Sequence, residues 1–353
     1  MNVPFFDMRA ETAALRGELD RAIARVLDSG TFIGGEEVTG FEAELARHCS
    51  TTHAIGTSSG TDALLVLGMA LGLAPGDEVV TTPLTFFATA GSFARLGATI
   101  VFADVRDDDL TLDADAALAA CTARTRAIVP VHLFGHPAAI PRATCPVIED
   151  SAQAIAASQL GGIAGALSFF PTKNLGALGD AGAVITDDDE LADRVRLLRT
   201  HGARPKYHHV ALGGNFRLDA MQAAVLRAKL THLAAWTARR RAHAHAYRAL
   251  FRAARVPAEL RLPAEHPGHI YHQFVIRAPR RDALRAHLAA SGIGTEVYYP
   301  ELLAGSTGLA GRCGALPVAT RVVREVLALP IYPAMPDVHR TLVVEAVERF
   351  YAS

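Results

Sequence analysis

Two charged residues, Asp150 and Lys173, stand at the ends of a run of 22 residues, 151–172, that contains no aspartate, glutamate, lysine or arginine. A lysine whose amine is poorly solvated has a lowered pKa, and a neutral amine can form a Schiff base with an aldehyde. Asp150 ends the apolar segment VIED, and a carboxylate buried there needs a cationic partner or several hydrogen bonds. A protonated pyridine nitrogen would meet that need. Each residue also has an ordinary interpretation: a solvated surface lysine, and an aspartate that caps a helix or forms a structural ion pair.

The segment GTSSGTDALL, which begins at Gly56, follows a short apolar stretch and opens a predicted helix. Small residues at a helix N-terminus leave backbone N–H groups pointing outward, and the helix dipole favours an anion there. The segment therefore predicts a phosphate site. The alternative is a capped helix in which Ser59 or Thr61 bonds the first turn, and the two interpretations are compatible.

These three features together indicate a single cofactor. Pyridoxal phosphate has an anionic phosphate group, a ring nitrogen that binds a carboxylate and an aldehyde that binds an amine. The glycine-rich segment, Asp150 and Lys173 supply one group for each. Ligand sites of α/β proteins gather at the carboxyl ends of the strands, and all three features fall at predicted strand ends.

The composition supports a globular protein that acts on a small molecule. At 353 residues, with 50% hydrophobic residues, the chain has material for a large domain and a smaller one. A net charge of -1 predicts no attraction to nucleic acid or to an anionic membrane. The four cysteines are scattered without a CxxC pair, which favours reduced thiols over a zinc site or a disulfide framework. MNVPFFDMRAE has no signal-peptide pattern, so we expect a cytoplasmic protein without a metal site.

Short apolar segments alternate with helical patterns over the first two thirds of the chain, which predicts an α/β fold. The predicted strands are apolar throughout, as expected for strands buried on both faces of a parallel or mixed sheet: EVVTTP, TIVFADV, AIVPVHLF, PVIED, ALSFFPT and AGAVIT. Residues 217–256 contain no glycine or proline, which predicts a long helix or a helix pair. Beyond it, YHQFVIRAP and TEVYYP predict two strands that flank a helix. We place the boundary near residue 245, between a large domain (1–245) and a small one (246–353).

Five motifs occur in an order that resembles the DegT/DnrJ/EryC1/StrS aminotransferases: GTSSGTDALL, TTPLTFFATA, VIEDSAQA, SFFPTKNLGALGDAGAVIT and GGNFRLDAMQAAVLRAKL. The resemblance extends from about residue 4 to about residue 333. It implies the aspartate aminotransferase fold (fold type I), with a mixed, mostly parallel sheet flanked by helices in the large domain and a smaller C-terminal α+β domain. It also implies an enzyme that uses pyridoxal phosphate to aminate keto sugars attached to nucleotides.

The resemblance assigns roles to the cofactor residues. Lys173 resembles the lysine that binds the cofactor and moves protons, and Asp150 resembles the carboxylate on the pyridine nitrogen. Gln153 matches the residue beside the ring hydroxyl. Phe86 matches an aromatic residue that stacks on the ring, although core packing is its ordinary interpretation.

The resemblance also assigns phosphate and substrate contacts. The matching positions for the phosphate are Gly60, Thr61 and Ser168, together with Asn215, which would reach the site of the neighbouring subunit in a homodimer with shared active sites. The matching substrate positions are His208, Arg217, Tyr298 and Tyr299. Solvation at the surface is the alternative for His208 and Arg217. The chain departs from the family where a histidine-tyrosine-proline triplet and a later proline-leucine-histidine are usual: it has Tyr298 at the first histidine and Glu301, Leu302 and Leu303 in the later positions.

The implied reaction moves the amino group of L-glutamate to a ketone of a nucleotide-linked sugar, for which we favour C3 over the alternative, C4. TFIGGEEVTGFE and SSGTDALL look closest to family members that act on 3-keto sugars. A UDP-linked 2-acetamido-3-oxo-hexuronate is the first candidate, and a dTDP-linked 3- or 4-keto-6-deoxyhexose is the second. Two rivals are a sugar dehydratase on the same scaffold, which has a histidine in place of Lys173, and a non-catalytic cofactor-binding protein with a regulatory or structural role.

Overall fold

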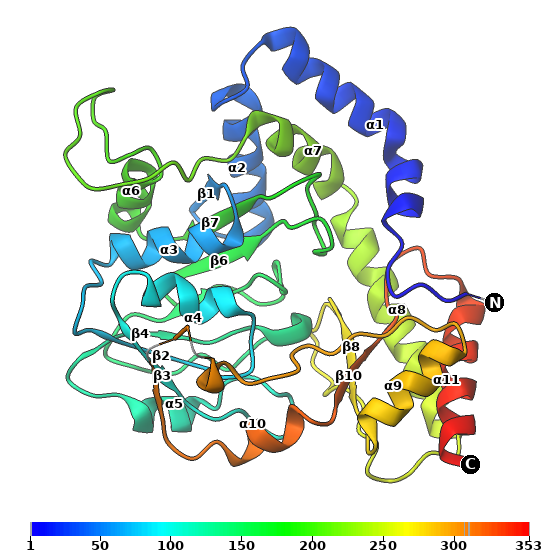
Figure 1. The fold of residues 1–353 in the computed structure, drawn as a ribbon. Helices are drawn as coiled ribbons and strands as arrows, with labels where there is room; N and C mark the ends of the chain where they lie inside the picture. The colour runs from blue at the N-terminus through cyan, green and yellow to red at the C-terminus, as the bar shows by residue number, and fades with distance from the viewer. Residues whose placement is uncertain (1, 307, 310, 353) are drawn as a thin grey trace.

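A large mixed sheet forms the core of the larger part of the molecule in the computed structural model, which describes residues 2–306, 308–309 and 311–352 (Figure 1). Two four-stranded sheets, ordered β1-β7-β6-β5 and β4-β2-β3-β9, are joined by parallel bridges from Ile128 to Val147 and from Val131 to Asp150. β7 is antiparallel to β1 and β6, whereas the other paired strands of these sheets are parallel. The strands are β1 (His53–Thr57), β2 (Glu78–Thr81), β3 (Thr99–Phe102), β4 (Thr125–Val129), β5 (Ile148–Asp150), β6 (Ala164–Ser168), β7 (Gly182–Thr186) and β9 (Gly311–Cys313).

Helices cover both faces of this sheet, which explains why its strands are apolar throughout. Val79 and Val80, neighbours on β2, are both fully buried, but they belong to different hydrophobic clusters on the two faces. The strands predicted at all six positions are confirmed. The helices around the sheet are α2 (Gly35–Cys49), α3 (Gly60–Ala70), α4 (Phe87–Ala94), α5 (Ala114–Ala120), α6 (Asp189–Leu198) and α7 (Ala220–Leu230), with short 3₁₀ turns at Leu133–Gly135 and Leu303–Gly305.

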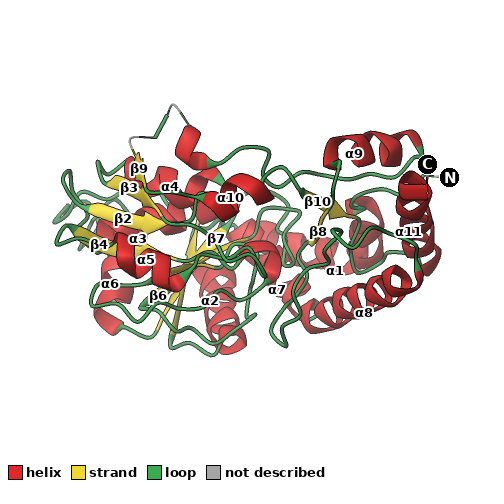
Figure 2. Ribbon diagram, turned by 90° about the horizontal axis from the view of Figure 1, so that it is seen from below, coloured by secondary structure: helices red, strands yellow, loops and turns green. Residues whose placement is uncertain are grey.

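A smaller group of elements lies at one end of the molecule, where both chain termini are found (Figure 2). β8 (Phe274–Arg277) and β10 (Val326–Leu329) form an antiparallel pair there. The helices of this part are α8 (Leu233–Ala253), α9 (Arg281–Ala290), α10 (Pro317–Val322) and α11 (Asp337–Ala352). The N-terminal segment joins it, because Val3 pairs with Ile293 before α1 (Met8–Ser29) begins.

Two features show that the two parts of the molecule are not separated at a single point in the sequence. The predicted boundary at residue 245 falls inside α8, and β9, from the C-terminal part of the chain, pairs with β3 of the large sheet. The expectation for 217–256 is confirmed as a helix pair, α7 and α8. The strand predicted for TEVYYP is wrong: this segment makes only an isolated bridge from Glu296 to Ala328, because its backbone turns toward the central cavity.

Candidate active site

The first turn of α3 forms an anion site at the edge of the central cavity. Ser59 is the N-cap residue, and its hydroxyl accepts a hydrogen bond from the amide of Asp62 at 3.0 Å, so the capping interpretation is confirmed for Ser59. Within the described residues, the amides of Gly60 and Thr61 have no hydrogen-bond partner. A Cβ atom on Gly60 would lie 2.7 Å from the Cβ of Ser168, so only glycine allows this approach of α3 to the end of β6. The two free amides can therefore bind a phosphate.

Asp150 lies at the end of β5, where parallel strands on both sides bring polar residues to one edge of the sheet. It is 4% exposed. Thr89 of α4 donates a hydrogen bond to Oδ2 at 2.6 Å, and the amide of Ala152 donates to Oδ1 at 3.1 Å. Among the described residues, no lysine, arginine or histidine forms an ion pair with this carboxylate. It lines a cavity and can accept a cationic ring nitrogen there.

Lys173 lies on a turn after β6 that is closed by a hydrogen bond from its own amide to the carbonyl of Phe170 at 2.8 Å. Its side chain lines the same cavity as Asp150. Desolvation lowers the pKa of the amine to about 8, against the opposing charge of Asp150. A neutral amine is the nucleophilic form, so this environment favours reaction with an aldehyde.

Both polar atoms of the Gln153 side chain form hydrogen bonds. Its Oε1 accepts a hydrogen bond from the amide of Phe134 at 2.5 Å, and its Nε2 donates to the hydroxyl of Tyr299 at 3.1 Å. Burial raises the pKa of Tyr299, so this hydroxyl stays protonated. Phe86 lies 6.4 Å from the Tyr299 ring, and 59% of its surface is exposed. An exposed aromatic face beside the cavity fits a residue that stacks on a ring rather than one packed in the core.

The cavity has a volume of about 430 Å³ and brings together nine of the twelve predicted site residues: Gly60, Thr61, Phe86, Asp150, Gln153, Ser168, Lys173, Tyr298 and Tyr299. Its donor set fits pyridoxal phosphate, with free amides for the phosphate, an unpaired carboxylate for the ring nitrogen and an amine for the aldehyde.

Three predicted residues lie outside this cavity. His208 is exposed in the loop after α6, and Asn215 is exposed and pairs with Thr200 in an antiparallel bridge. Arg217 is half-buried beside Thr57, and its Nε is buried without a hydrogen-bond partner. Their proposed roles stay predictions.

The structure adds three polar residues that the sequence interpretation missed: Thr89, His272 and Gln273. Thr89 holds Asp150, and the other two line the cavity from the segment that leads into β8. The signal for the latter pair was present in YHQFVIR, where two polar residues directly precede an apolar strand.

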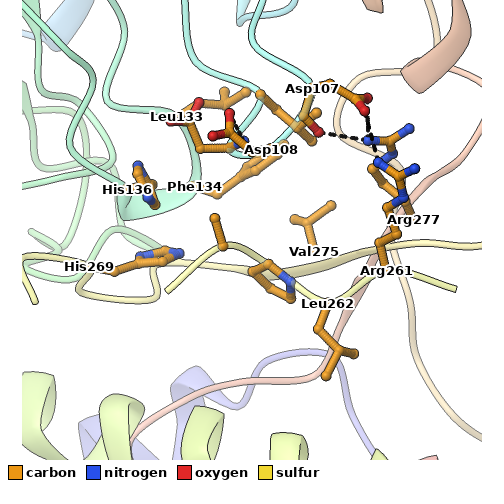
Figure 3. Close-up of a pocket in the computed structure, with 14 residues that line it drawn as sticks. Asp107, Asp108, Leu133, Phe134, His136, Arg261, Leu262, His269, Val275 and Arg277 are labelled. Carbon is orange, nitrogen blue, oxygen red and sulfur yellow. Dashed lines mark hydrogen bonds and ion pairs between the residues drawn. The ribbon is translucent and has the colours of Figure 1, made fainter. Parts of the chain in front are cut away.

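A second, smaller cavity of about 90 Å³ lies between the segment after β3 and the segments around β8 (Figure 3). We call it the rear cavity. Asp107 at its rim accepts hydrogen bonds from Arg261 at 2.8 Å and from Arg277 at 2.6 Å. Phe134 lines this cavity, and its amide binds Gln153 of the active-site cavity.

Fold and site together define a pyridoxal-phosphate-dependent aminotransferase of fold type I. The DegT/DnrJ/EryC1/StrS aminotransferase family model matches residues 14–348, and the chain belongs to that family. Among curated relatives, the chain is 44% identical to a pleiotropic regulatory protein of Geobacillus stearothermophilus, over 99% of both chains. It is 44% identical to dTDP-3-amino-3,4,6-trideoxy-alpha-D-glucose transaminase of Streptomyces venezuelae (99% and 96% covered). It is 36% identical to UDP-2-acetamido-2-deoxy-3-oxo-D-glucuronate aminotransferase of Pseudomonas aeruginosa (94% and 95% covered).

Solved structures support the fold and the cofactor. The crystal structure of DesV from S. venezuelae, in complex with a ketimine intermediate, superimposes with a TM-score of 0.95 at 44% identity and covers 100% of this chain and 99% of that one. NtdA from Bacillus subtilis, solved with bound pyridoxamine phosphate, has a TM-score of 0.93 at 29% identity, with 100% and 86% covered. The cofactor prediction, pyridoxal or pyridoxamine phosphate, is confirmed. In the part of the chain that the structure describes, no helix has the length and apolar character needed to cross a membrane.

Proposed function

We propose that this nucleotide-sugar aminotransferase moves the amino group of L-glutamate to the C3 ketone of a nucleotide-linked hexose. The observation that carries the proposal is that Asp150 and Lys173, neither of which forms a salt bridge among the described residues, line one cavity with an anion site. Pyridoxal phosphate, when bound, supplies an aldehyde that accepts an amino group and a ring that takes up negative charge.

The residues of this chain supply binding and proton transfer. Gly60 and Thr61 bind the phosphate through their amides, and Asp150 keeps a proton on the ring nitrogen. Lys173 Nζ, when neutral, takes the proton from the α-carbon of the amino donor, and in the second half of the reaction the protonated amine delivers a proton to the sugar carbon that becomes aminated. With a pKa of about 8, roughly a tenth of the free amine is neutral at pH 7.

For the sugar, we favour a dTDP-linked 3-keto deoxyhexose over a UDP-linked hexuronate, which reverses the order of the two candidates from the sequence. The relative named for a dTDP-linked 3-amino sugar is 44% identical, whereas the one named for a UDP-linked 3-oxo-glucuronate is 36% identical. The experiment that tests this is consumption of L-glutamate in the presence of each ketosugar. The expected result is 2-oxoglutarate formed in step with a dTDP-linked 3-amino sugar. Release of 2-oxoglutarate that stays at one equivalent per active site with either sugar, or that exceeds one equivalent without any sugar, contradicts the proposal.

A regulatory role is the second candidate, because a relative of the same identity is named a pleiotropic regulatory protein. The same assay separates the two. A protein that binds the cofactor but consumes no glutamate with any ketosugar fits the regulatory role, and multiple turnovers contradict a purely regulatory one.

We also propose that the active site is completed by a second subunit. Asn215 is exposed and lies outside the cavity of its own chain. Large apolar side chains are also exposed: Phe86 and Phe170 line the cavity, Phe87 follows Phe86 in the chain, and Phe32, Ile33 and Leu178 lie on segments that bond to residues 219–222. Exposed apolar side chains in such number are typical of an interaction surface. Lys173→Ala and Asn215→Ala, each inactive alone, should recover part of the activity when their subunits are mixed and exchange. No recovery after proven exchange contradicts the shared site.

A further inference from the structure

The segment 270–273 is held rigidly at the wall of the active-site cavity. Two of its backbone amides donate hydrogen bonds to the carbonyls of Phe134 and Gly135, at 3.2 and 3.0 Å. Arg240, buried in α8, donates from Nη1 to the carbonyls of Tyr271 at 3.3 Å and of the next residue at 3.2 Å. Tyr271 has a φ of 46°, a left-handed conformation that a tyrosine rarely adopts. The surrounding bonds hold this turn, and it directs the two following side chains toward the cavity.

His272 has one defined tautomer. Its Nδ1 lies 2.8 Å from Oδ1 of Asn174, whose Nδ2 donates to the carbonyl of Ile270 at 3.4 Å. Because the amide nitrogen of Asn174 is used as a donor, its oxygen accepts, and His272 Nδ1 carries the proton. Desolvation, with smaller effects of the charges of Lys173 and Arg240, lowers the pKa of His272 well below its usual value. The imidazole is therefore neutral, and Nε2 carries a lone pair.

Gln273 differs from the other glutamine of the cavity. Both polar atoms of Gln153 are hydrogen-bonded, as described above. Gln273 is only 6% exposed, and its Oε1 has no hydrogen-bond partner within the described residues. A buried acceptor without a donor is unfavourable unless a ligand supplies one.

We propose that Gln273 Oε1 and His272 Nε2 form an acceptor pair that binds the sugar hydroxyl groups next to the keto carbon, with one hydroxyl donor for each acceptor. Both groups accept, so the ligand must donate. Lys173, which acts at the reacting carbon in the proposed function, lines the same cavity as His272 and Gln273, so groups bound by this pair lie near that carbon. The proposal rests on the proposed function, and it makes Gln273 a specificity-determining residue for the sugar and not for glutamate.

The test compares two amino donors on the same form of the enzyme. Protein loaded with pyridoxal phosphate is mixed with either L-glutamate or dTDP-3-amino-3,6-dideoxy-α-D-galactopyranose, and conversion of the cofactor to its amine form is followed by absorbance. Gln273→Met removes the acceptor and keeps the side-chain length. It should raise the half-saturating concentration of the amino sugar about tenfold, because the loss of one hydrogen bond weakens binding by about that factor. The half-saturating concentration of glutamate should change less than about twofold. Gln273→Glu, which retains acceptor oxygens, should recover most of the sugar affinity.

Binding without turnover gives an independent readout. In a Lys173→Ala background, calorimetry with the same amino sugar should show the same tenfold loss of affinity for Gln273→Met. Equal losses with sugar and glutamate, or no loss with the sugar, overturn the proposal. Failure of the unmodified protein to react with glutamate instead overturns the proposed function, so the two failures are distinguishable. Nitrogen NMR of His272, assigned by comparison with His272→Phe, should show protonated Nδ1 and bare Nε2; a proton on Nε2 overturns its part of the pair.

Discussion

The active-site cavity and the rear cavity are lined by similar kinds of residue but differ in how their charged groups are satisfied. In the rear cavity, Asp107 is bonded to Arg261 and Arg277, so the charges hold the segment after β3 to the segments around β8 (Figure 3). In the active-site cavity, Asp150 has only a hydroxyl and an amide as described partners, and Lys173 has a lowered pKa. Charges joined in salt bridges stabilise the fold, whereas Asp150 and Lys173, which form no salt bridge in the part of the chain that the structure describes, are available to bind in the larger cavity.

The largest expected effect is that of Lys173→Ala. In the proposed function the Lys173 amine is both the covalent attachment point and the proton acceptor, so its removal should lower turnover at least ~1,000-fold. Single-turnover absorbance with glutamate measures this, and cofactor binding by the variant serves as the control for folding. Appreciable turnover by a cofactor-loaded variant contradicts the role of Lys173.

Asp150→Asn should have the next largest effect. The amide can still accept the hydrogen bond from Thr89, but it carries no charge to hold a proton on the ring nitrogen. We expect the rate of the glutamate half-reaction to fall about 100-fold to 1,000-fold. Thr89→Val is the matched variant, since it removes the 2.6 Å bond and keeps the carboxylate, and it should cost about tenfold. Equal losses for the two variants would show that the charge itself is unimportant.

The pH dependence of the proton-transfer rate tests whether the Lys173 amine of the active-site cavity is available to act as a base. Lys173 acts as the neutral amine, and its pKa is lowered to about 8, so the neutral fraction rises as pH rises through that value. The rate of the proton-transfer step should increase roughly tenfold per pH unit below about pH 7 and level off above the pKa. Single-turnover rates over this range measure it. A rate independent of pH contradicts Lys173 as the base.

The smallest effect is expected in the rear cavity. Burial alone would raise the pKa of Asp107, but hydrogen bonds from Arg277, Arg261 and Arg321 outweigh it and lower the pKa to about 2. Asp107 therefore stabilises the folded state above its unfolded pKa, and this contribution is lost as pH falls through about 2. Because its side chain is 40% exposed, Asp107→Asn should lower the free energy of unfolding by only about 1 kcal/mol.

Denaturant unfolding at neutral pH measures that loss, with Asp108→Asn as the control, since the Asp108 carboxylate bonds the nearby Arg106 and the amide of Asp109 in its own turn at the surface. The glutamate half-reaction of Asp107→Asn should remain within about twofold of the unmodified protein. A large loss of that activity without loss of stability would show that the rear cavity belongs to the active site.

The sequence predicts the strands and the central charges well, because both are local patterns. Lys173, Asp150 and the glycine-rich turn at Gly60 occur at strand ends, and buried strands are apolar regardless of their partners. Thr89 was missed because its role depends on contact between α4 and β5, which the helix pattern does not encode. Gln273 was missed because the direction of its side chain depends on the left-handed turn at Tyr271.

The domain boundary predicted near residue 245 also depends on tertiary contacts that the sequence pattern does not encode. A continuous helix pattern predicts α8 but not which elements pack along it, and α8 contacts α11 while following α7 from the large sheet. Similarly, TEVYYP has the composition of a strand, but tertiary packing places Tyr298 and Tyr299 at the cavity instead. The division into domains 1–245 and 246–353 stays a prediction.

The most direct test of the central claim is the absorbance spectrum of the protein with pyridoxal phosphate, before and after addition of L-glutamate. The unpaired charges of the active-site cavity predict that the cofactor binds at Lys173, and that glutamate converts it to pyridoxamine phosphate with one equivalent of 2-oxoglutarate. A bound cofactor whose spectrum is unchanged by glutamate, glutamine and aspartate would contradict the account, because it would show that Asp150 and Lys173 bind without catalysing amino transfer.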